Sequence, residues 1–401
     1  MALEALFMSE YIPVPAITPA YVFDVDAFQQ RIRRIAKALP GIPLTFSIKA
    51  NPFLIGSIPG EIQHLEVCSP GELSLCERFA AKGEADLGSV IFSGVNKTRE
   101  NVQQALADKV GIFTAESRKH LCLIDEETGK NDPAAKVPVI LRVSSGNQFG
   151  MDPEEVRALI ADRGQYEHAS IMGLHFYSGT QKKKASQIRE ELEMLDAFID
   201  GLKKDFGFDC CLMEYGPGMA VDYFGQDPES TDMALLGEVA PMLLSFAEKH
   251  PLGVEMGRYM AASCGHYFTK VDDIKTTQDV NYAILDGGIH HLKYHGQTMS
   301  MQVPPIRVIQ GKDGAMTTAG PQTWCLCGSL CTTADVFVRK VELRGLTEGT
   351  ILDFGRCGAY SVTEAPALFL SRPMPAIYLY KDELHLVRDQ IQACDLNQGI
   401  L

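Results

Sequence analysis

The sequence lacks the features that mark membrane and secreted proteins. No apolar run approaches the roughly 20 residues of a membrane span, and Met1-Ala2-Leu3-Glu4 is not a basic segment followed by an apolar one. The 11 cysteines are an odd number and do not form the framework of a small disulfide-stapled scaffold. These absences predict a cytoplasmic protein with reduced thiols.

Positive charge is also scarce. The chain has 37 Lys and Arg against 51 Asp and Glu, a formal net charge of −14 at pH 7. Such a balance disfavours nucleic acid and anionic membrane surfaces as partners, and we expect neither. With 46% hydrophobic and 22% charged residues, the composition is that of an ordinary soluble globular protein.

Up to about residue 264, strand-like and helix-like segments alternate. Asp26 and Ser69-Pro70-Gly71-Glu72 are expected to begin two of the helices. The strands are expected at residues 43–48, 90–92, 110–113, 137–143, 171–175 and 211–215. This alternation implies a parallel sheet covered on both faces, and the number of units favours closure. We predict a (β/α)8 TIM-like barrel over residues 22–264.

From Gly265 onward the pattern changes to short strands with few helices between them. The turn Lys381-Asp382-Glu383 is expected to join two runs into a hairpin. The expected strands are Tyr267–Val271, Tyr282–Leu285, Pro305–Ile309, Val336–Leu343 and Ile377–Tyr380. We predict a C-terminal β-sandwich or β-barrel domain made of residues 1–21 and 265–401.

The strongest candidate for chemistry is Lys49. Lys49 directly follows the run Phe46-Ser47-Ile48, so it is expected at the end of a barrel strand, where such barrels have their active sites. Desolvation there lowers the pKa of a lysine and frees its amine to form a Schiff base. Taken alone the signal is weak, because most lysines that end a strand are solvated.

Later strands supply the groups that pyridoxal phosphate (PLP) requires. Gly216-Pro217-Gly218 follows a strand and can present backbone N–H groups to a phosphate, although an isolated Gly-Pro-Gly is more often a tight turn. Tyr177 offers an aromatic face and Thr180 a hydroxyl. Glu255 can keep a pyridine nitrogen protonated, which makes the ring the electron sink that decarboxylation needs.

Taken in order, these motifs resemble the fold-type III PLP-dependent decarboxylases, the group of ornithine, arginine and diaminopimelate decarboxylases with an alanine racemase-like barrel. The resemblance covers nearly the whole chain. Its motifs are Phe46-Ser47-Ile48-Lys49-Ala50-Asn51, Glu66-Val67-Cys68-Ser69-Pro70-Gly71-Glu72-Leu73, Glu255-Met256-Gly257-Arg258, Gly328-Ser329-Leu330-Cys331 and Gly358-Ala359-Tyr360.

The resemblance implies a role for each of these motifs. Lys49 would form the Schiff base and Glu255 would face the pyridine nitrogen. Gly257, Arg258 and Tyr360 would lie near the phosphate. Cys331 would donate a proton in the active site of a second copy, since the family forms homodimers with shared active sites.

Three departures bear on the substrate. Thr332 stands where an acidic residue usually follows the cysteine, residues 287–294 lack the arginine that grips a distal carboxylate, and Tyr177 replaces a ring-stacking histidine. Loss of the partner of a distal ammonium argues against free lysine, ornithine or diaminopimelate, because an unpaired buried charge is costly.

The departures are similar to motifs of decarboxylases that act on aminoacyl groups tethered to a carrier protein, such as the glutamyl-carrier-protein decarboxylase of butirosin biosynthesis. The similar stretches are Gly288-Ile289-His290-His291, residues 175–181 and residues 369–373. His290, His291 and Thr332 are expected to line the substrate pocket. The His and Cys spacings are not those of a usual zinc site, and no metal is expected.

Several alternatives stay open at this point. Lys182-Lys183-Lys184 could dock an acidic carrier protein, or could be the solvated start of the next helix. The enzyme could act on a free amino acid. The chain could also be a PLP-free regulatory homologue, a reading that Gln148 and Tyr177 leave open. Glu255 argues against racemisation, since alanine racemase has an arginine at the pyridine nitrogen.

Overall fold

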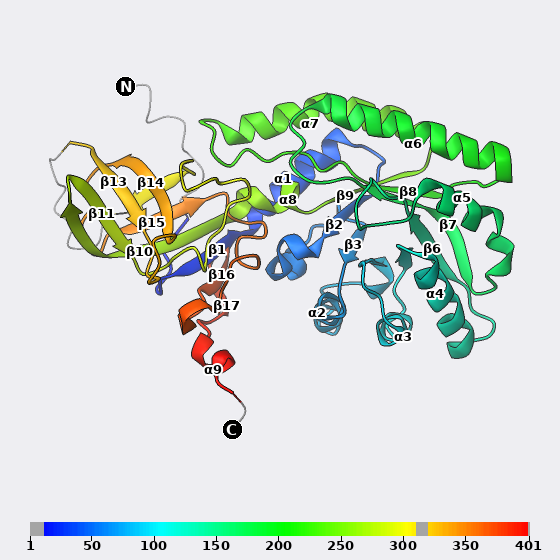
Figure 1. Ribbon diagram of the computed structural model, residues 1–401, viewed down its shortest axis with the longest axis horizontal. Coiled ribbons are helices and arrows are strands. Elements are labelled where there is room, and N and C mark those ends of the chain that lie inside the picture. Colours follow the sequence, from blue (N-terminus) through cyan, green and yellow to red (C-terminus); the bar gives the residue numbers. More distant parts are fainter. Residues whose placement is uncertain (1–11, 310–319, 400–401) are drawn as a thin grey trace. The chain divides into compact units, whose positions relative to one another are not determined.

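The computed structural model describes residues 12–309 and 320–399. The chain divides into two compact units (Figure 1). The first, the barrel unit, consists of Gln29–Asp222 and Asp227–Met260. The second, the β unit, consists of the described residues up to Phe28, Tyr223–Gln226 and the described residues from Ala261 onward.

Parallel strands close the barrel in chain order, so the prediction of a (β/α)8 barrel is confirmed. Leu44 pairs with Val254 where the last strand meets the first. In the described part of the chain the eight barrel strands are β2 (Leu44–Ser47), β3 (His64–Val67), β4 (Val90–Phe92), β5 (Ile112–Ala115), β6 (Val137–Arg142), β7 (Ala169–Tyr177), β8 (Leu212–Gly216) and β9 (Leu252–Met256).

Helices separate the strands. They are α1 (Val25–Ala38), α2 (Pro70–Ala80), α3 (Arg99–Ala107), α4 (Arg118–Asn131), α5 (Pro153–Ala161), α6 (Ala185–Phe206), α7 (Pro228–Ala247) and α8 (Arg258–Ala261). The predicted cap of α2 is confirmed, because the Ser69 hydroxyl accepts a hydrogen bond from Glu72 N. The predicted cap at Asp26 is wrong. Ala27 N donates to Asp24 Oδ1 at 2.9 Å, and Asp26 lies inside the first turn.

The β unit contains a mixed sheet, in which nine strands can be followed among the described residues. The order is β14-β13-β11-β10-β1-β16-β17, with β15 paired to β10 and β12. The strands are β1 (Ala20–Asp24), β10 (Gly265–Thr277), β11 (Val280–Leu285), β12 (Ile306–Ile309), β13 (Gln322–Cys327), β14 (Val336–Leu343), β15 (Ile351–Gly355), β16 (Ala376–Lys381) and β17 (Glu383–Arg388). The short helix α9 (Ala393–Asn397) follows.

The N-terminal strand β1 lies in this sheet, antiparallel to β10 and parallel to β16. The boundary expected at Val22 therefore falls within a strand. The predicted hairpin at Asp382 is confirmed by the pairing of Lys381 with Glu383. Of the helices in residues 12–309 and 320–399, none combines the length and the apolar character that crossing a membrane requires.

Candidate active site

Lys49 lies just beyond the end of β2, in a single 3-10 turn formed by Ile48–Ala50. Its Nζ is 2.6 Å from Glu66 Oε2 and 3.3 Å from Cys68 Sγ. Glu66 is buried on β3, whereas the lysine side chain is 36% exposed. The amine is thus held by a buried carboxylate, on a side chain that is partly exposed. Sequence reasoning missed Glu66 as a site residue, although a charge inside the apolar run of β3 was a signal.

Glu255, on β9, is the second buried carboxylate of the site. Ser47 Oγ donates to its Oε1 at 3.0 Å, and His175 Nε2 lies 3.3 Å from its Oε2. Burial alone would raise the pKa of Glu255, but His175, Lys49 and Ser47 together lower it below the ordinary value. The carboxylate is therefore ionised at neutral pH, as partnering a protonated pyridine nitrogen requires.

The loops after β7 and β8 run against each other. Lys182 N donates to Gly218 O at 2.9 Å, and Ala220 N donates to Lys182 O at 3.0 Å. Gly218 has φ +61°, and a Cβ there would lie 1.9 Å from Gly179 O. A Cβ on Gly216 would lie 2.6 Å from Tyr177 Cδ2. Only glycine permits this close approach, which leaves a backbone-lined cradle.

A cation and a hydroxyl border the cradle. Arg258, which follows β9, is buried and donates from Nε to Thr180 Oγ1 at 3.2 Å. Gly257 precedes it, and a Cβ there would lie 2.9 Å from Ala50 Cβ. Burial raises the pKa of Tyr177, so its hydroxyl stays protonated at neutral pH. An arginine beside a glycine cradle suits a phosphate group.

These residues fit PLP. A lysine amine for the aldehyde, a buried carboxylate for the pyridine nitrogen and a glycine cradle with an arginine for the phosphate all occur in the barrel unit. The side chains that the sequence predicted for PLP there act on one another electrostatically: Lys49, Glu255 and Arg258 each affect the pKa of Tyr177. Such convergence of perturbed groups is typical of an active site.

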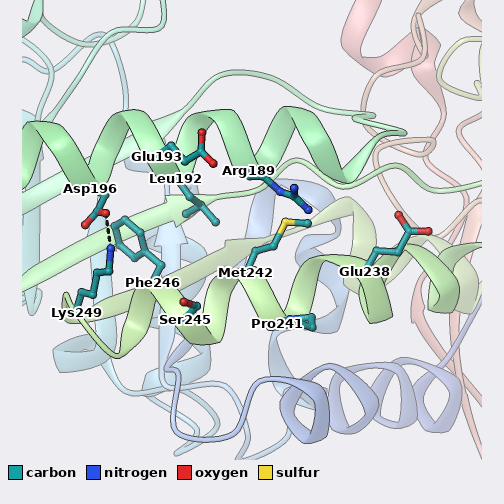
Figure 2. Close-up of a pocket in the computed structure, with 10 residues that line it drawn as sticks. All are labelled: Arg189, Leu192, Glu193, Asp196, Glu238, Pro241, Met242, Ser245, Phe246 and Lys249. Atoms are coloured by element: carbon teal, nitrogen blue, oxygen red, sulfur yellow. Dashed lines mark hydrogen bonds and ion pairs between the residues drawn. The ribbon is translucent and has the colours of Figure 1, made fainter.

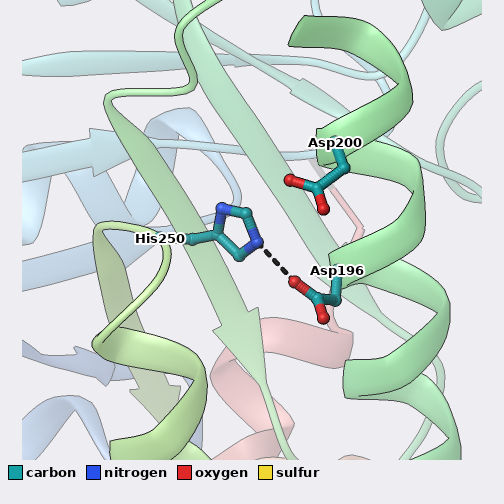
Figure 3. Close-up of side chains that lie close together, drawn as sticks. All are labelled: Asp196, Asp200 and His250. Carbon is teal, nitrogen blue, oxygen red and sulfur yellow. Dashed lines mark hydrogen bonds and ion pairs between the residues drawn. The ribbon is translucent and has the colours of Figure 1, made fainter. Parts of the chain in front are cut away.

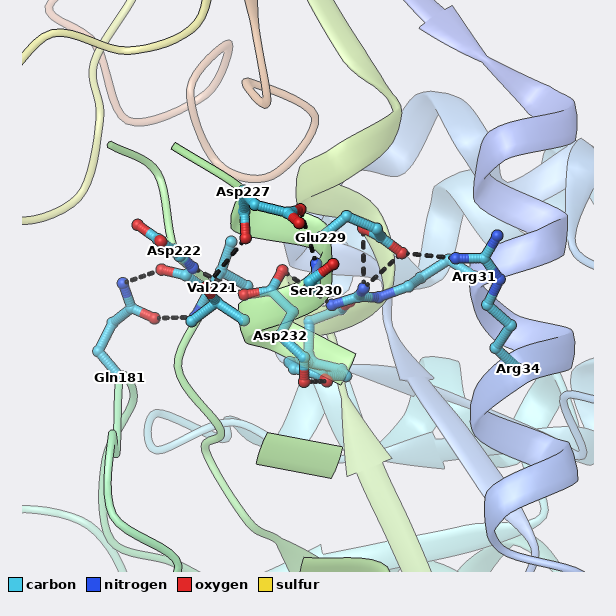
Figure 4. A network of polar contacts seen from close by, with 11 residues as sticks. Arg31, Arg34, Gln181, Val221, Asp222, Asp227, Glu229, Ser230 and Asp232 are labelled. Atoms are coloured by element: carbon cyan, nitrogen blue, oxygen red, sulfur yellow. Dashed lines mark hydrogen bonds and ion pairs between the residues drawn. The ribbon is translucent and has the colours of Figure 1, made fainter. Parts of the chain in front are cut away.

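A polar network holds the β8 loop in place (Figure 4). Gln181 bonds both backbone groups of Val221, accepting from N at 2.6 Å and donating to O at 3.1 Å. Asp232, on α7, accepts from Asp222 N at 2.8 Å and from Arg31 Nη2 at 3.0 Å. Arg31 also bonds Glu229 and Tyr259 O. The network ties the cradle to α7 and α1.

Arg31→Met is expected to lower the free energy of unfolding by about 3–5 kcal/mol, because it leaves the buried Asp232 carboxylate without its cation. Arg34→Met is the matched control. Arg34 lies on the same helix and also bonds Glu229, but it is 53% exposed, so its loss should cost less than about 1 kcal/mol. Urea unfolding measures both, and equal losses would contradict a structural role for the buried pair.

The basic run Lys182-Lys183-Lys184 differs from the expected solvated start of a helix. Lys182 is buried, with its Nζ 2.7 Å from Glu191 Oε2, and Tyr215 Oη donates to the same oxygen at 2.5 Å. It is therefore not the solvated start of α6, because Glu191 draws it inward. Lys183 and Lys184 are exposed just before the helix begins at Ala185.

The β unit carries the remaining predicted residues on neighbouring loops. Asp335 is buried and accepts hydrogen bonds from Ile289 N at 2.8 Å and Leu330 N at 2.6 Å. It thereby joins the loop of His290 and His291 to the loop of Cys331 and Thr332. The Cys331 side chain is exposed and Thr332 is half-buried. Tyr360 is half-buried and adopts φ +65°.

The two histidines have different surroundings. His291 Nδ1 is 3.1 Å from Tyr267 Oη, and its Nε2 is 2.8 Å from Pro373 O. His290 is 1% exposed, and neither of its ring nitrogens is hydrogen-bonded to a residue that the structure describes. Burial and Arg372 lower the pKa of His290 to about 4, so the ring is neutral. A substrate role for both histidines remains a prediction.

Away from the strand ends, one group in the described part of the chain could offer three metal ligands: Asp196, Asp200 and His250 (Figure 3). His250 Nε2 lies 2.7 Å from Asp196 Oδ1, and Lys249 Nζ lies 2.6 Å from Oδ2. The Lys249 ammonium on the Asp196 carboxylate competes with a metal cation, and we assign no metal here.

Asp196 also borders a groove of about 470 Å³ between α6 and α7 (Figure 2).

Fold and site together define a PLP-dependent barrel enzyme, and comparison with known proteins makes the class specific. Residues 25–262 match the family model "Pyridoxal-dependent decarboxylase, pyridoxal binding domain". The match covers more than half of the chain, and the protein belongs to the pyridoxal-dependent decarboxylases. Pyridoxal phosphate is accordingly its cofactor.

Two curated relatives illustrate the similarity. The L-glutamyl-[BtrI acyl-carrier protein] decarboxylase of Niallia circulans is 26% identical over 94% of this chain and 92% of its own. A diaminopimelate decarboxylase of Pseudomonas aeruginosa is 28% identical over 86% and 83%. The crystal structure of the diaminopimelate decarboxylase from Helicobacter pylori complexed with L-lysine has a TM-score of 0.81 at 21% identity, covering 95% and 96%, and shows the shared fold.

Proposed function

We propose that this protein decarboxylates an amino acid that is tethered to a carrier protein through its side-chain carboxyl group, so that the α-carboxylate is free to leave as CO₂, in the manner of a glutamyl-carrier-protein decarboxylase. The observation that carries the proposal is the neutral Thr332 directly after Cys331, which offers no partner to a distal ammonium. A thioester-tethered substrate has no free charge at its far end that needs such a partner. The similarity to the Niallia circulans enzyme along nearly the whole chain supports this substrate class.

Each residue has a role in the proposal. Bound PLP supplies the electron sink for the carbanion left when CO₂ departs. Glu255 holds a proton on the pyridine nitrogen, and Glu66 orients the Lys49 amine. Arg258 and the glycine cradle hold the phosphate, with Tyr177 and Thr180 beside them and Tyr360 as a further contact. Cys331 returns a proton to Cα, while His290 and His291 line the substrate pocket.

We further propose that the protein is a cytoplasmic homodimer whose active sites are completed across the interface. All 11 cysteines lie within the described ranges and are free thiols, as suits a reducing compartment. The β unit exposes Cys331 and several apolar side chains that a second copy could cover. The apolar side chains are Leu368, Phe369, Leu370, Leu386, Val387 and Leu396.

The substrate class is tested by comparing a glutamyl-loaded carrier protein with free amino acids. We expect kcat/KM for the carrier-bound glutamyl group to exceed that for free glutamate, ornithine or diaminopimelate by at least ~100-fold, because an unpaired distal charge is rejected strongly. CO₂ release measures both. A glutamyl thioester of N-acetylcysteamine, which has no carrier, separates recognition of the thioester from recognition of the protein.

The second candidate is a decarboxylase of free diaminopimelate, favoured by the 28% identity to the Pseudomonas aeruginosa enzyme. Efficient turnover of free diaminopimelate, with none of the carrier-bound glutamyl group, would establish it and overturn the tethered-substrate proposal.

A further inference from the structure

One carboxylate of the barrel unit reaches the cradle from a helix and has no role in the chemistry described so far. Glu191 lies near the start of α6, and its side chain is only 15% exposed. Its Oε1 accepts a hydrogen bond from Ser178 Oγ. Its Oε2 accepts from Lys182 Nζ at 2.7 Å and from Tyr215 Oη at 2.5 Å. Both oxygens of this carboxylate are therefore bonded to side chains beside the loops that form the cradle.

These donors bracket the cradle along the chain. Ser178 and Lys182 stand at the two ends of the segment Gly179-Thr180-Gln181, which follows β7. Tyr215 directly precedes Gly216, where β8 ends. Because one carboxylate bonds all of them, it fixes both ends of the β7 loop against the end of β8. The backbone hydrogen bonds between Lys182 and the β8 loop are thus supported by a side chain from α6.

The segment between these anchors has a backbone that needs support. Gly179 has φ +146° and Gln181 has φ +62°. The left-handed region is unfavourable for a residue with a Cβ and persists where the surrounding structure enforces it, so Gln181 depends on its neighbours. Between the two, the Thr180 hydroxyl accepts a hydrogen bond from Arg258 Nε at 3.2 Å. A displaced segment would separate this hydroxyl from the arginine that borders the cradle.

The charges of this network are balanced within it. Lys182 is buried, and its ammonium neutralises the Glu191 carboxylate, so the carboxylate does not oppose an anion in the cradle. Burial lowers the pKa of Lys182, and Glu191 acts against this shift. Burial and Glu191 raise the pKa of Tyr215, so the hydroxyl keeps the proton that it donates. Removing Glu191 alone would leave a buried ammonium unpaired, which is costly, so a test has to remove both charges.

We propose that Glu191 is a positioning residue for the phosphate of the cofactor. It holds the loops after β7 and β8 against each other through Ser178, Lys182 and Tyr215, and it thereby determines how tightly the cradle binds the phosphate. The inference rests on the proposed role of the cradle toward that phosphate. Glu191 acts from behind the loops, so its effect is confined to the phosphate end of the cofactor.

The test compares the affinities of the cofactor-free, full-length protein for PLP and for pyridoxal, which lacks the phosphate. The double variant Lys182→Met/Glu191→Gln removes the anchor without leaving an unpaired charge. Its affinity for PLP should fall about 10-fold, the lower end of what removal of a residue behind a metal ligand costs. Its affinity for pyridoxal should not change, because the anchor acts on the phosphate end alone. Equilibrium dialysis measures both affinities.

Two single variants on α6 serve as controls. Glu193→Gln is at an exposed position and should bind both ligands as wild type does. Leu202→Ala is at a buried position near the other end of the helix, and it should lower the Tm without changing the ratio of the two affinities.

The outcomes separate this inference from the function on which it rests. A double variant that loses affinity for PLP and pyridoxal equally, or that keeps full affinity for both, would overturn the role of Glu191 and leave the decarboxylase proposal intact. A wild-type protein that does not prefer PLP to pyridoxal would contradict the phosphate cradle itself, and the inference with it.

Tyr215→Phe keeps the inference testable if the double variant does not fold. It removes one hydrogen bond to Glu191 and leaves the buried ring in place. We expect a smaller loss of affinity that is again confined to PLP. Unchanged affinity of this variant for PLP would refute the proposed role.

Discussion

Lys49→Ala should abolish both covalent cofactor attachment and decarboxylation. The amine lies 2.6 Å from Glu66 and belongs to the group of side chains that act on Tyr177 and Glu255. We expect activity to fall on the order of 10³-fold or more, as when a residue that forms a covalent bond to its reactant is removed. The purified variant should lack the yellow absorbance that we expect of wild type with bound PLP.

Lys49→Arg is the matched control for charge. It keeps a cation beside the buried Glu66 but cannot condense with an aldehyde, so it should fold as wild type does and remain inactive. Borohydride reduction of wild type should fix a pyridoxyl group on the peptide containing Lys49, detected by mass, and on neither variant. A wild-type protein that stays colourless with added PLP would instead make the regulatory homologue the leading hypothesis.

Six of the eight barrel strands were predicted because their signal is local, whereas β3 and β9 were not among the expected strands. Each unit repeats a short apolar strand and an amphipathic helix, and the polar residue after each strand is placed by chain order alone. The strands β13 and β15 of the β unit were not predicted. Their partners are distant in sequence: β13 pairs with β11, and β15 pairs with β10 and β12. Local pattern says little about such pairing, since sheet partners decide whether a short run becomes a strand.

The site was predictable where side chains follow strands and obscure where they lie within them. Lys49 and the glycines follow or end strands, so the barrel rule alone gathers them. Glu255 lies within β9 and was identified through the motif that it begins, Glu255-Met256-Gly257-Arg258. Glu66 sits inside an apolar run, where the inward face depends on register. Lys182 was misread for a related reason, because its partner Glu191 lies nine residues further on in the next helix.

Two inactive variants should restore each other's activity when mixed, if active sites are completed across a dimer. Cys331→Ala alone should keep the cofactor, since Cys331 belongs to the β unit and the PLP-binding side chains that converge on Lys49 belong to the barrel unit. Loss of its proton donation should cost about 10²–10⁴-fold in rate. Lys49→Ala keeps Cys331 but lacks the amine that binds the cofactor. In a mixed dimer, one of the two sites has both residues intact.

Random exchange of subunits makes half of the dimers mixed, and each mixed dimer has one working site out of two. Activity should therefore recover to about a quarter of wild type. Refolding or coexpressing the two variants together, followed by a rate measurement, reads this out. Lys49→Ala mixed with Lys49→Arg is the control and should stay inactive, because every site then lacks the amine. Dimers by light scattering without any recovery would place Cys331 and Lys49 of the same chain in one site. A monomer would contradict the proposal that active sites are completed by a second copy.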